Sequence, residues 1–443
     1  MRLFLNLFLA LGLCGGAAVF AEENAQSVRV NLNVEKWTLP NGLTVLFHED
    51  HSVPLVSYQQ WFRVGSKDEV PGHTGLAHFF EHLMFKGSKN YPKETFNRVL
   101  NAKGANFNAF TTTDYTGYFI NAPSSQLEFI IKVEADRMRN LIISPEEIKT
   151  EREVVKEERR TRYENSPEGY MWVALPELMY QNLPYRWPTI GSMKDLNDSK
   201  TEDFQNFYNE FYAPNNAVVV VAGHFDTAQV KKWIQAQYGS FQAQKLERPK
   251  VTPEPEQKKA RQKIVPWKVQ SPIVMVAYPT VDVQDQDSYA LEILGTLLGS
   301  GESSRLYHKL VYQDQLATGV SSFNYAQVLA GKMMFIMNLK KGVSPATAKK
   351  LLENEIWMLI NKGVSAGELE KAKNQILTGQ VEELKKVSGR ARALVYNEII
   401  FGDYKRLFTD LEKYLAVTPE DLQRVAKKYL VPEHENIVII QPQ

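Results

Sequence analysis

A chain of 443 residues is too long for one ordinary hydrophobic core, and its length alone predicts two or three domains. Its content of 44% hydrophobic and 23% charged residues is typical of a soluble globular protein. The formal net charge is only +1, which argues against a nucleic-acid-binding protein, because such proteins carry a basic patch or stripe. A short basic stretch at 258–263 lies in a linker, where we interpret it as a solvated, flexible segment.

The first 21 residues have the pattern of a secretory signal peptide. Arg2 precedes an apolar run over 3–20, and Val19 and Ala21 provide the small-residue exit at which such segments are cleaved. An uncleaved membrane anchor is the alternative, because the apolar run approaches the length that spans a bilayer. We expect cleavage after Ala21, which leaves no membrane span. We also expect export, and a periplasmic location if the source is a Gram-negative bacterium.

The only cysteine of the chain, Cys14, lies inside this N-terminal segment. Leu13 is bulky where a lipoprotein signal carries a small residue, so we do not expect a lipid anchor at Cys14. An exported chain that has lost Cys14 forms no disulfide and no thiolate zinc site. Its core must then supply all of its stability.

A stretch at 243–263, rich in Lys, Glu, Gln and Pro, has the composition of a linker. It contains almost no large apolar residue. We therefore predict a first domain over 22–242 and a second domain over 264–443.

The two predicted domains resemble each other in sequence. The pattern at 201–222 returns at 418–440, and the pattern at 144–148 returns at 365–369, with offsets of 217 and 221 residues. Two nearly equal offsets of this length indicate a duplicated domain rather than a solenoid of short repeats.

Within the first domain, strand and helix patterns are mixed. An Asn-Gly pair ending at Gly42 interrupts the strand pattern of 37–47 and predicts a hairpin, because this pair favours a turn with positive φ. A further strand is expected at 55–64. Helices are expected at 75–86, 93–102, 125–140 and 145–163, the last with a capping box that begins at Ser144. We predict an α+β fold of two homologous domains, each an antiparallel sheet with helices packed on one face.

Residues 78–82 read HFFEH, the strongest chemical signal in the sequence. Histidines four residues apart lie about 40° apart around a helix and about 6 Å along it, so His78 and His82 can reach one metal ion. Glu81 lies beside them and can take a proton from a metal-bound water. The alternative is structural: two histidines on a half-buried helix face, each satisfied by hydrogen bonds.

A catalytic zinc ion needs three protein ligands and an open position for water, so a third ligand has to come from elsewhere. The helix expected at 145–163 carries Glu151 and Glu158, which are seven residues and about 20° apart on one face. The same helix is rich in Glu, Lys and Arg. On its own, this pattern also suits a solvated, salt-bridged face.

In these residues the sequence resembles the insulinase-like (pitrilysin-type) zinc peptidases, in particular their half-length bacterial and mitochondrial processing members. Members of that family carry H-x-x-E-H and a glutamate ligand about 76 residues further on, and here Glu158 follows His82 by 76 residues. The run EREVVKEE at 151–158 is similar to the family's E-R-x-V-V-x-E-E. Gly87 and the Pro-Asn-Gly at 40–42 also match, and the resemblance covers nearly all of the chain after the signal segment.

The resemblance implies a Zn2+ ion with three protein ligands: His78, His82 and Glu158. It makes Glu81 the general base and Glu151 the carboxylate that supports the ligands from behind. The neighbouring Glu157 would point roughly 100° away from Glu158 around the helix.

The stretch 104–109, with Thr111 after it, resembles the edge strand to which a peptide substrate of this family adds as an extra strand. The resemblance implies that Asn108 and Ala109 contact the substrate. As plain sequence, the stretch is a Gly- and Asn-rich turn that enters a strand.

The second domain departs from the family pattern. An Arg and, seven residues later, a Tyr usually help to bind substrate and stabilise the transition state, but Val311 and Thr318 occupy these positions. Neither side chain can donate the charge-assisted or phenolic hydrogen bond that is needed. The resemblance to heterodimeric members then implies a homologous partner subunit that supplies the Arg/Tyr pair.

The family resemblance implies a zinc-dependent endopeptidase that hydrolyses peptides or unfolded segments. Its domains would enclose a peptide cavity, alone or with the partner subunit. Two alternatives come from other classes: a non-catalytic scaffold or assembly subunit, and a zinc-stabilised protein that binds peptides without cutting them. All four expected metal-site residues are present, which argues against the scaffold.

Overall fold

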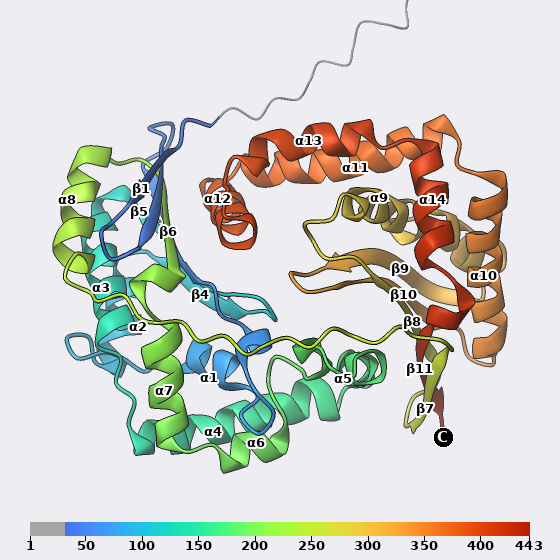
Figure 1. Ribbon diagram of the computed structural model, residues 1–443, viewed down its shortest axis with the longest axis horizontal. Coiled ribbons are helices and arrows are strands. Elements are labelled where there is room, and N and C mark those ends of the chain that lie inside the picture. Colours follow the sequence, from blue (N-terminus) through green and yellow to red (C-terminus); the bar gives the residue numbers. More distant parts are fainter. Residues whose placement is uncertain (1–31) are drawn as a thin grey trace, which may run out of the picture. The chain divides into compact units, whose positions relative to one another are not determined.

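The structure of the protein is a computed structural model, and it describes residues 32–443 (Figure 1). The predicted signal peptide and residues 22–31 of the first predicted domain lie outside the described residues. Among the helices of residues 32–443, none combines the length and the apolar character that a bilayer crossing requires.

The first half of the described chain forms a six-stranded sheet in the order β1-β2-β6-β3-β5-β4. Its strands are β1 (Glu35–Thr38), β2 (Thr44–Glu49), β3 (Leu55–Phe62), β4 (Asn106–Thr111), β5 (Thr116–Pro123) and β6 (Ala217–Gly223). The predicted hairpin is confirmed as β1 and β2, and Gly42 in its turn has a φ of +87°. Neighbouring strands are antiparallel except β2 and β6, so the sheet is mixed and not purely antiparallel as predicted. Strand β4 lies at one edge.

The second half forms a five-stranded sheet in the order β7-β11-β8-β10-β9. Its strands are β7 (Arg261–Trp267), β8 (Ile273–Thr280), β9 (Ala317–Ala326), β10 (Gly331–Leu339) and β11 (Asn436–Pro442). Strand β7 begins inside the predicted linker, so residues 261–263 belong to the second sheet. Both sheets contain one parallel pair, β2–β6 or β7–β11, followed by three antiparallel strands in matching order. The matching order confirms the predicted duplication of one α+β fold.

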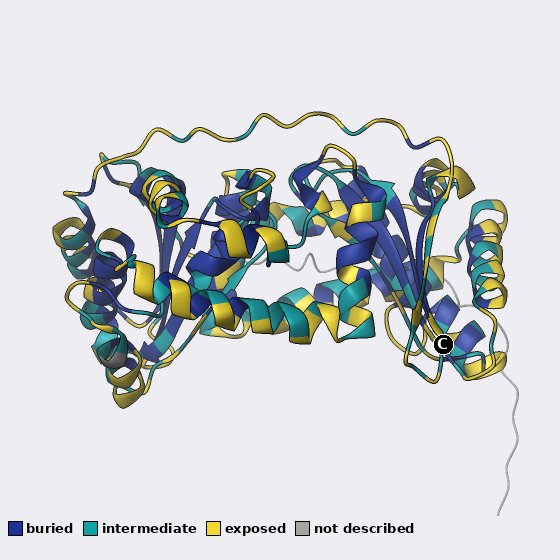
Figure 2. Ribbon diagram, turned by 90° about the horizontal axis from the view of Figure 1, so that it is seen from below, coloured by how far each residue is buried: buried dark blue, intermediate teal, exposed yellow. Residues whose placement is uncertain are grey.

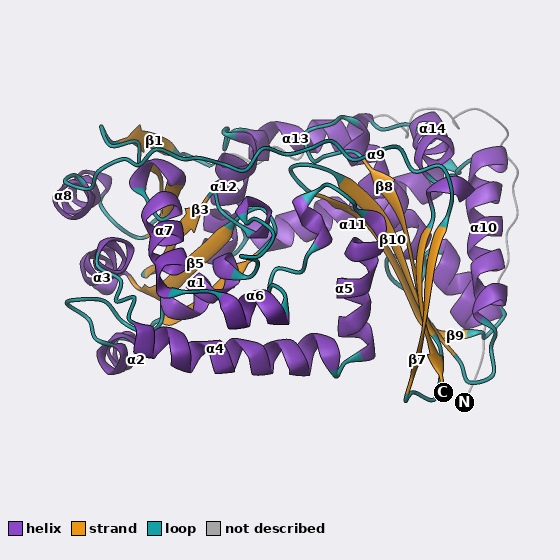
Figure 3. Ribbon diagram, turned by 60° about the horizontal axis from the view of Figure 1, so that its bottom comes forward, coloured by secondary structure: helices purple, strands orange, loops and turns teal. Residues whose placement is uncertain are grey.

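Helices pack around the strands in both halves (Figure 3). Those of the first half are α1 (Leu76–Leu83), α2 (Lys93–Ala102), α3 (Leu127–Arg139), α4 (Pro145–Arg159), α5 (Pro167–Met179), α6 (Met193–Asp198), α7 (Thr201–Phe211) and α8 (Thr227–Tyr238). Those of the second half are α9 (Asp287–Gly299), α10 (Pro345–Lys362), α11 (Ala366–Leu384), α12 (Val387–Phe401), α13 (Arg406–Ala416) and α14 (Pro419–Tyr429). Two π-helical segments, Arg160–Glu164 and Tyr307–Gln313, accompany them. Short 3-10 helices lie at Ser66–Asp68, Ser124–Gln126, Pro184–Arg186, Pro214–Asn216 and Pro432–His434.

The four helices predicted in the first domain are confirmed as α1 to α4. Ser144 caps α4, because its hydroxyl accepts from the backbone N–H of Glu147 at 3.2 Å. The reciprocal bond of a capping box is replaced: the Glu147 carboxylate accepts from Lys93 Nζ at 3.4 Å. The π-helical segment extends this helix to Glu164, close to the predicted end at 163.

Each sheet is covered on both faces, which the prediction of helices on one face did not include. Helix α12 of the second half packs on the first sheet, where Leu394 and Val395 share a buried cluster with Trp61. Helix α5 of the first half packs on the second sheet, where Met171 shares a cluster with Met275. Each half thus contributes one helix to the covering of the other half's sheet. The central strands of both sheets are accordingly buried, as Figure 2 shows, and β6 is buried at every position.

We predict that Leu394→Ala destabilises the protein by about 2–5 kcal/mol, because it leaves a cavity between α12 and the first sheet. Leu394 is 0% exposed, whereas Leu415 on α13 is 45% exposed and provides the matched control. Leu415→Ala should change the free energy of unfolding by no more than about 0.5 kcal/mol. Urea denaturation of both variants measures the difference. Equal losses would contradict the packing role of α12.

Candidate metal centre

Helix α1, which carries the HFFEH motif, is fixed at its first turn. Gly75 precedes the helix with a φ of +94°, a left-handed conformation that favours glycine. The backbone N–H groups of Gly75 and Ala77 both donate to the buried carboxylate of Glu69 at 2.8 Å, which satisfies two free donors of that turn. Phe80 is fully buried and packs against Phe204 of α7. The direction of α1 is therefore set by its surroundings.

Helices α1 and α4 bring the three predicted metal ligands together. His78 Nε2 lies 3.8 Å from Glu158 Oε1, and His82 Nε2 lies 3.1 Å from Glu158 Oε2. One potential ligand atom from each of the three residues lies within 4.8 Å of the other two. Three donors from two separate helices therefore face one point.

The donor set fits a zinc ion. Ligand atoms about 2.0–2.1 Å from a tetrahedral zinc ion lie about 3.3–3.5 Å from one another. The two imidazole-to-carboxylate distances of 3.1 and 3.8 Å lie on either side of this range. Two imidazoles and one carboxylate also leave a fourth position for water, as in catalytic zinc sites.

A second layer of polar contacts orients these ligands. His82 Nδ1 lies 2.8 Å from Glu151 Oε1, so Nε2 is the nitrogen that faces the ligand cluster. The other oxygen of Glu151 pairs with Lys86. Arg162 Nη1 lies 2.8 Å from Glu158 Oε1. The sequence indicated the position of Glu151, but we did not predict Lys86 or Arg162, whose charges look like ordinary surface charges in the sequence.

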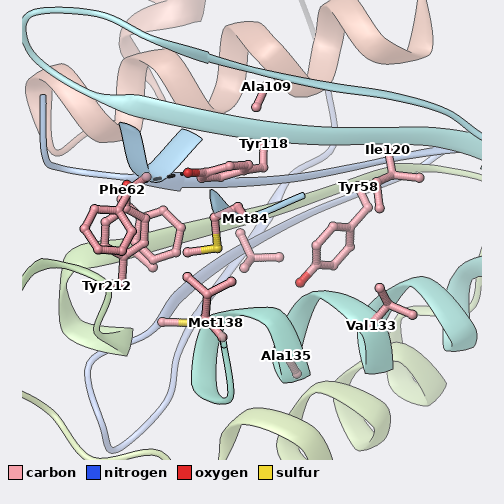
Figure 4. Packing of buried hydrophobic residues seen from close by; sticks show 14 of the residues in the cluster. Tyr58, Phe62, Met84, Ala109, Tyr118, Ile120, Val133, Ala135, Met138 and Tyr212 are labelled. Carbon is pink, nitrogen blue, oxygen red and sulfur yellow. Dashed lines mark hydrogen bonds between the residues drawn. The ribbon is translucent and has the colours of Figure 1, made fainter. Parts of the chain in front are cut away.

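Glu81 is joined to the edge strand of the first sheet. Its Oε2 accepts a hydrogen bond from the hydroxyl of Thr111 on β4 at 2.8 Å. Burial raises the pKa of Glu81, and the hydrogen bond from Thr111 opposes this rise. Helix α1 and β4 also share a core, since Met84, directly after α1, and Ala109 belong to one buried cluster (Figure 4).

The remaining predicted residues of the first half lie as follows. Asn108 is exposed on β4, and its side-chain oxygen accepts from the backbone N–H of Ala109 at 2.9 Å. Ala109 itself is buried. Glu157 is 65% exposed and pairs with Arg160 at 3.0 Å, so it stays outside the ligand cluster as expected.

Val311 and Thr318, at the positions of the missing Arg/Tyr pair, make ordinary contacts. Val311 lies in the π-helical segment Tyr307–Gln313 and packs against the core of the second half. Thr318 lies on β9, and its hydroxyl donates to the backbone oxygen of Asn338 at 3.2 Å. Neither side chain offers a cation or a phenol.

The two histidines of the ligand cluster have different pKa values. Burial lowers the pKa of His78 to about 4, helped by the nearby charge of His82. For His82, burial would lower the pKa, but hydrogen bonds to Glu151 and Glu158 outweigh it and raise the pKa to about 9. The hydrogen bond from His82 in turn lowers the pKa of Glu158.

We predict that zinc binding at pH 7 releases close to one proton. In the metal-free cluster at this pH, His78 is neutral because its pKa lies below 7, and His82 is protonated because its pKa lies above 7. Since zinc binds neutral imidazole, His82 must give up its proton. Calorimetric titrations with zinc in buffers of different ionisation enthalpy measure this number. Release of no proton would contradict the predicted charge of His82.

Comparison with known proteins finds similar proteins over most of the chain. Residues 44–192 match the family model "Insulinase (Peptidase family M16)", and residues 200–376 match "Peptidase M16 inactive domain". The zinc protease PqqE of Helicobacter pylori is 33% identical over 428 residues, which cover 92% of this chain and 93% of PqqE.

Solved structures agree with these sequence matches. The crystal structure of a protease from Helicobacter pylori is similar with a TM-score of 0.89 and 29% identity, covering 93% of this chain and 100% of that one. A structure described as the peptidase M16 inactive domain from Pseudomonas fluorescens gives a TM-score of 0.85 at 18% identity, covering 93% of this chain and 98% of that one. At that identity the second likeness shows the fold alone.

The described chain has two repeated α+β domains, with a histidine-glutamate cluster on α1 and α4 of the first, and it shares its fold with the Helicobacter pylori protease. The chain belongs to the insulinase family, peptidase family M16. The family resemblance in the sequence is thereby confirmed.

Proposed function

We propose that the protein is a zinc-dependent endopeptidase that hydrolyses peptides or unfolded segments. The observation that carries this proposal is the convergence of ligand atoms from His78, His82 and Glu158 to within 4.8 Å, with Glu81 on the same helix as the histidines. The name zinc protease, given to PqqE, supports it.

We propose a role for each of these side chains, and their contacts support it. A zinc ion bound by the three ligands would polarise the scissile carbonyl and lower the pKa of the attacking water. Glu81 accepts a proton from that water and returns it to the leaving amine. Thr111 holds Oε2 of Glu81, which leaves Oε1 to meet the proton. Glu151 keeps His82 oriented through its Nδ1 atom.

We propose β4 as the place where the substrate backbone binds. It is an edge strand of the first sheet, and a peptide can extend such an edge through backbone hydrogen bonds. The contact of Thr111 with Glu81 places this edge beside the proposed base. Asn108 and Ala109 are the residues we expect to contact the substrate.

We further propose that the protein acts as the catalytic subunit of a heterodimer. Val311 packs against a core and Thr318 donates to a backbone oxygen, and neither side chain can donate the charge-assisted or phenolic hydrogen bond of the Arg/Tyr pair. A homologous partner subunit that carries Arg and Tyr at these positions would complete the site. The test compares the purified chain with and without such a partner, and full activity of the chain alone would rule the partner out.

One experiment separates the peptidase from its rivals. Metal analysis of the purified chain, with and without a candidate partner, is combined with a quenched-fluorescence assay on unfolded peptides. A peptidase contains zinc and cleaves, whereas a zinc-stabilised binding protein contains zinc and binds the peptide intact. A scaffold subunit neither cleaves nor requires zinc. Absence of cleavage in every combination would overturn the proposal.

We also propose that the protein is exported after removal of residues 1–21, on the basis of the N-terminal pattern. Mass spectrometry of the protein recovered from its native cells measures the mature N-terminus. A mature chain that still begins at Met1 would rule cleavage out.

A further inference from the structure

Two exposed histidines meet at the end of the first sheet, away from the HFFEH motif in the sequence. His51 lies in the turn between β2 and β3, and His224 directly follows β6. Their Nδ1 atoms are 3.2 Å apart. The ring centroids are 4.6 Å apart and the ring planes meet at 81°, so the imidazoles approach edge to face.

The backbone fixes the segments that carry these histidines. The N–H of Asp50 donates to the oxygen of Gly223 at 2.8 Å, and the N–H of His224 donates to the oxygen of Leu55 at 2.9 Å. These bonds extend the pairing of β6 with β2 and with β3. Since both segments are anchored to β6, the two imidazoles are held near each other by the sheet.

The carboxylate of Glu49 contacts one ring nitrogen of His51, and the other ring nitrogen faces His224. Glu49, the last residue of β2, lies with Oε1 at 2.9 Å from His51 Nε2. Its other oxygen accepts from the backbone N–H of Thr227 at 3.0 Å and from the Thr227 hydroxyl at 2.6 Å. When Nε2 of His51 donates to Glu49, Nδ1 keeps its lone pair and points at His224. A carboxylate behind an imidazole is the usual support of a metal-binding histidine.

We propose that His51 and His224 form a second metal site, which binds Cu2+ through their Nδ1 atoms. Two nitrogens about 2.0–2.1 Å from one ion, at bond angles of about 90–109°, lie about 2.8–3.4 Å apart, and the observed 3.2 Å falls in this range. Imidazole suits copper, nickel and zinc, and Cu2+ binds most tightly in this series. Water fills the remaining positions, since the His51 side chain is 57% exposed.

A simple hydrogen bond between two neutral imidazoles would place the nitrogens at a similar distance. It differs in one measurable respect, because it provides no saturable metal binding that depends on both rings. The matched control is His308, which is also exposed and lies next to Tyr312 rather than another histidine.

The test adds less than one equivalent of Cu2+ to the full, zinc-loaded chain. Electron paramagnetic resonance detects nitrogen ligands, and competition with glycine measures the affinity. We expect His51→Ala and His224→Ala each to weaken Cu2+ binding at least about tenfold, and Glu49→Gln to weaken it by about 10–100-fold. His308→Ala should leave the affinity unchanged.

Equal Cu2+ affinity in the wild type and in both histidine variants would overturn the proposal. So would release of one zinc ion for each Cu2+ bound, because copper would then occupy the α1–α4 cluster. Neither readout depends on peptide hydrolysis, so this second site and the proposed peptidase function stand or fall separately.

Discussion

Glu81→Gln should abolish peptide hydrolysis while zinc remains bound. Glutamine keeps the shape of the side chain and can still contact the Thr111 hydroxyl that now donates to Oε2 at 2.8 Å. It cannot accept the proton of the attacking water. Loss of a general base typically costs about 10²–10⁴ in rate, so kcat should fall at least that far. The zinc content should match the wild type, because Glu81 is not among the three converging ligands.

Glu157→Gln is the matched control for this substitution. Glu157 lies directly before the proposed ligand Glu158, yet it points to solvent and pairs with Arg160. Its replacement should leave both hydrolysis and zinc content unchanged. Undiminished cleavage by the Glu81 variant would contradict the role of the base. Loss of zinc from that variant would mean that its carboxylate binds the metal.

Local sequence signals predicted many elements of the fold. The Asn-Gly pair ending at Gly42 marks a turn with positive φ, and Ser144 before Pro145 marks a helix start, because each signal acts within a few residues. The exchange of α5 and α12 between the sheets could not be predicted in this way. Their apolar residues predict burial but not the surface against which they pack.

The same limit applies to the parallel strand pairs. β2 and β6 are separated by most of the first half, and an apolar run such as 217–222 carries no information about the direction of its partner. The matching parallel pair of the second half follows from the duplication, once one copy is known.

In the metal centre, spacing on a helix predicted which residues could act together. His78 and His82 share one face, and the family pattern added Glu158 and Glu151 on α4. The hydrogen bond from Thr111 to Glu81 was not predicted, because it joins a strand to a helix 30 residues earlier. Such a contact depends on the tertiary packing of α1 against β4 and has no local sequence signal.

His82→Ala should remove zinc and hydrolysis together. His82 contacts Glu158 through one nitrogen and Glu151 through the other, so its loss deletes a ligand and leaves two buried or half-buried carboxylates without their shared partner. With two protein ligands left, the cluster cannot hold zinc at the concentrations used in assays, and activity should fall to background. Zinc content by atomic emission, measured on the same sample as cleavage, checks both.

Glu151→Gln should weaken zinc binding without removing a ligand. It keeps all three proposed ligands but weakens the support of His82, which should lower zinc affinity by about 10–100-fold and leave activity recoverable in excess zinc. Added zinc should not rescue His82→Ala. The contrast separates a ligand from its support, since the first supplies an atom to the metal and the second only fixes the direction of the ring. If His82→Ala keeps a full equivalent of zinc, the convergence of His78, His82 and Glu158 does not form the metal site.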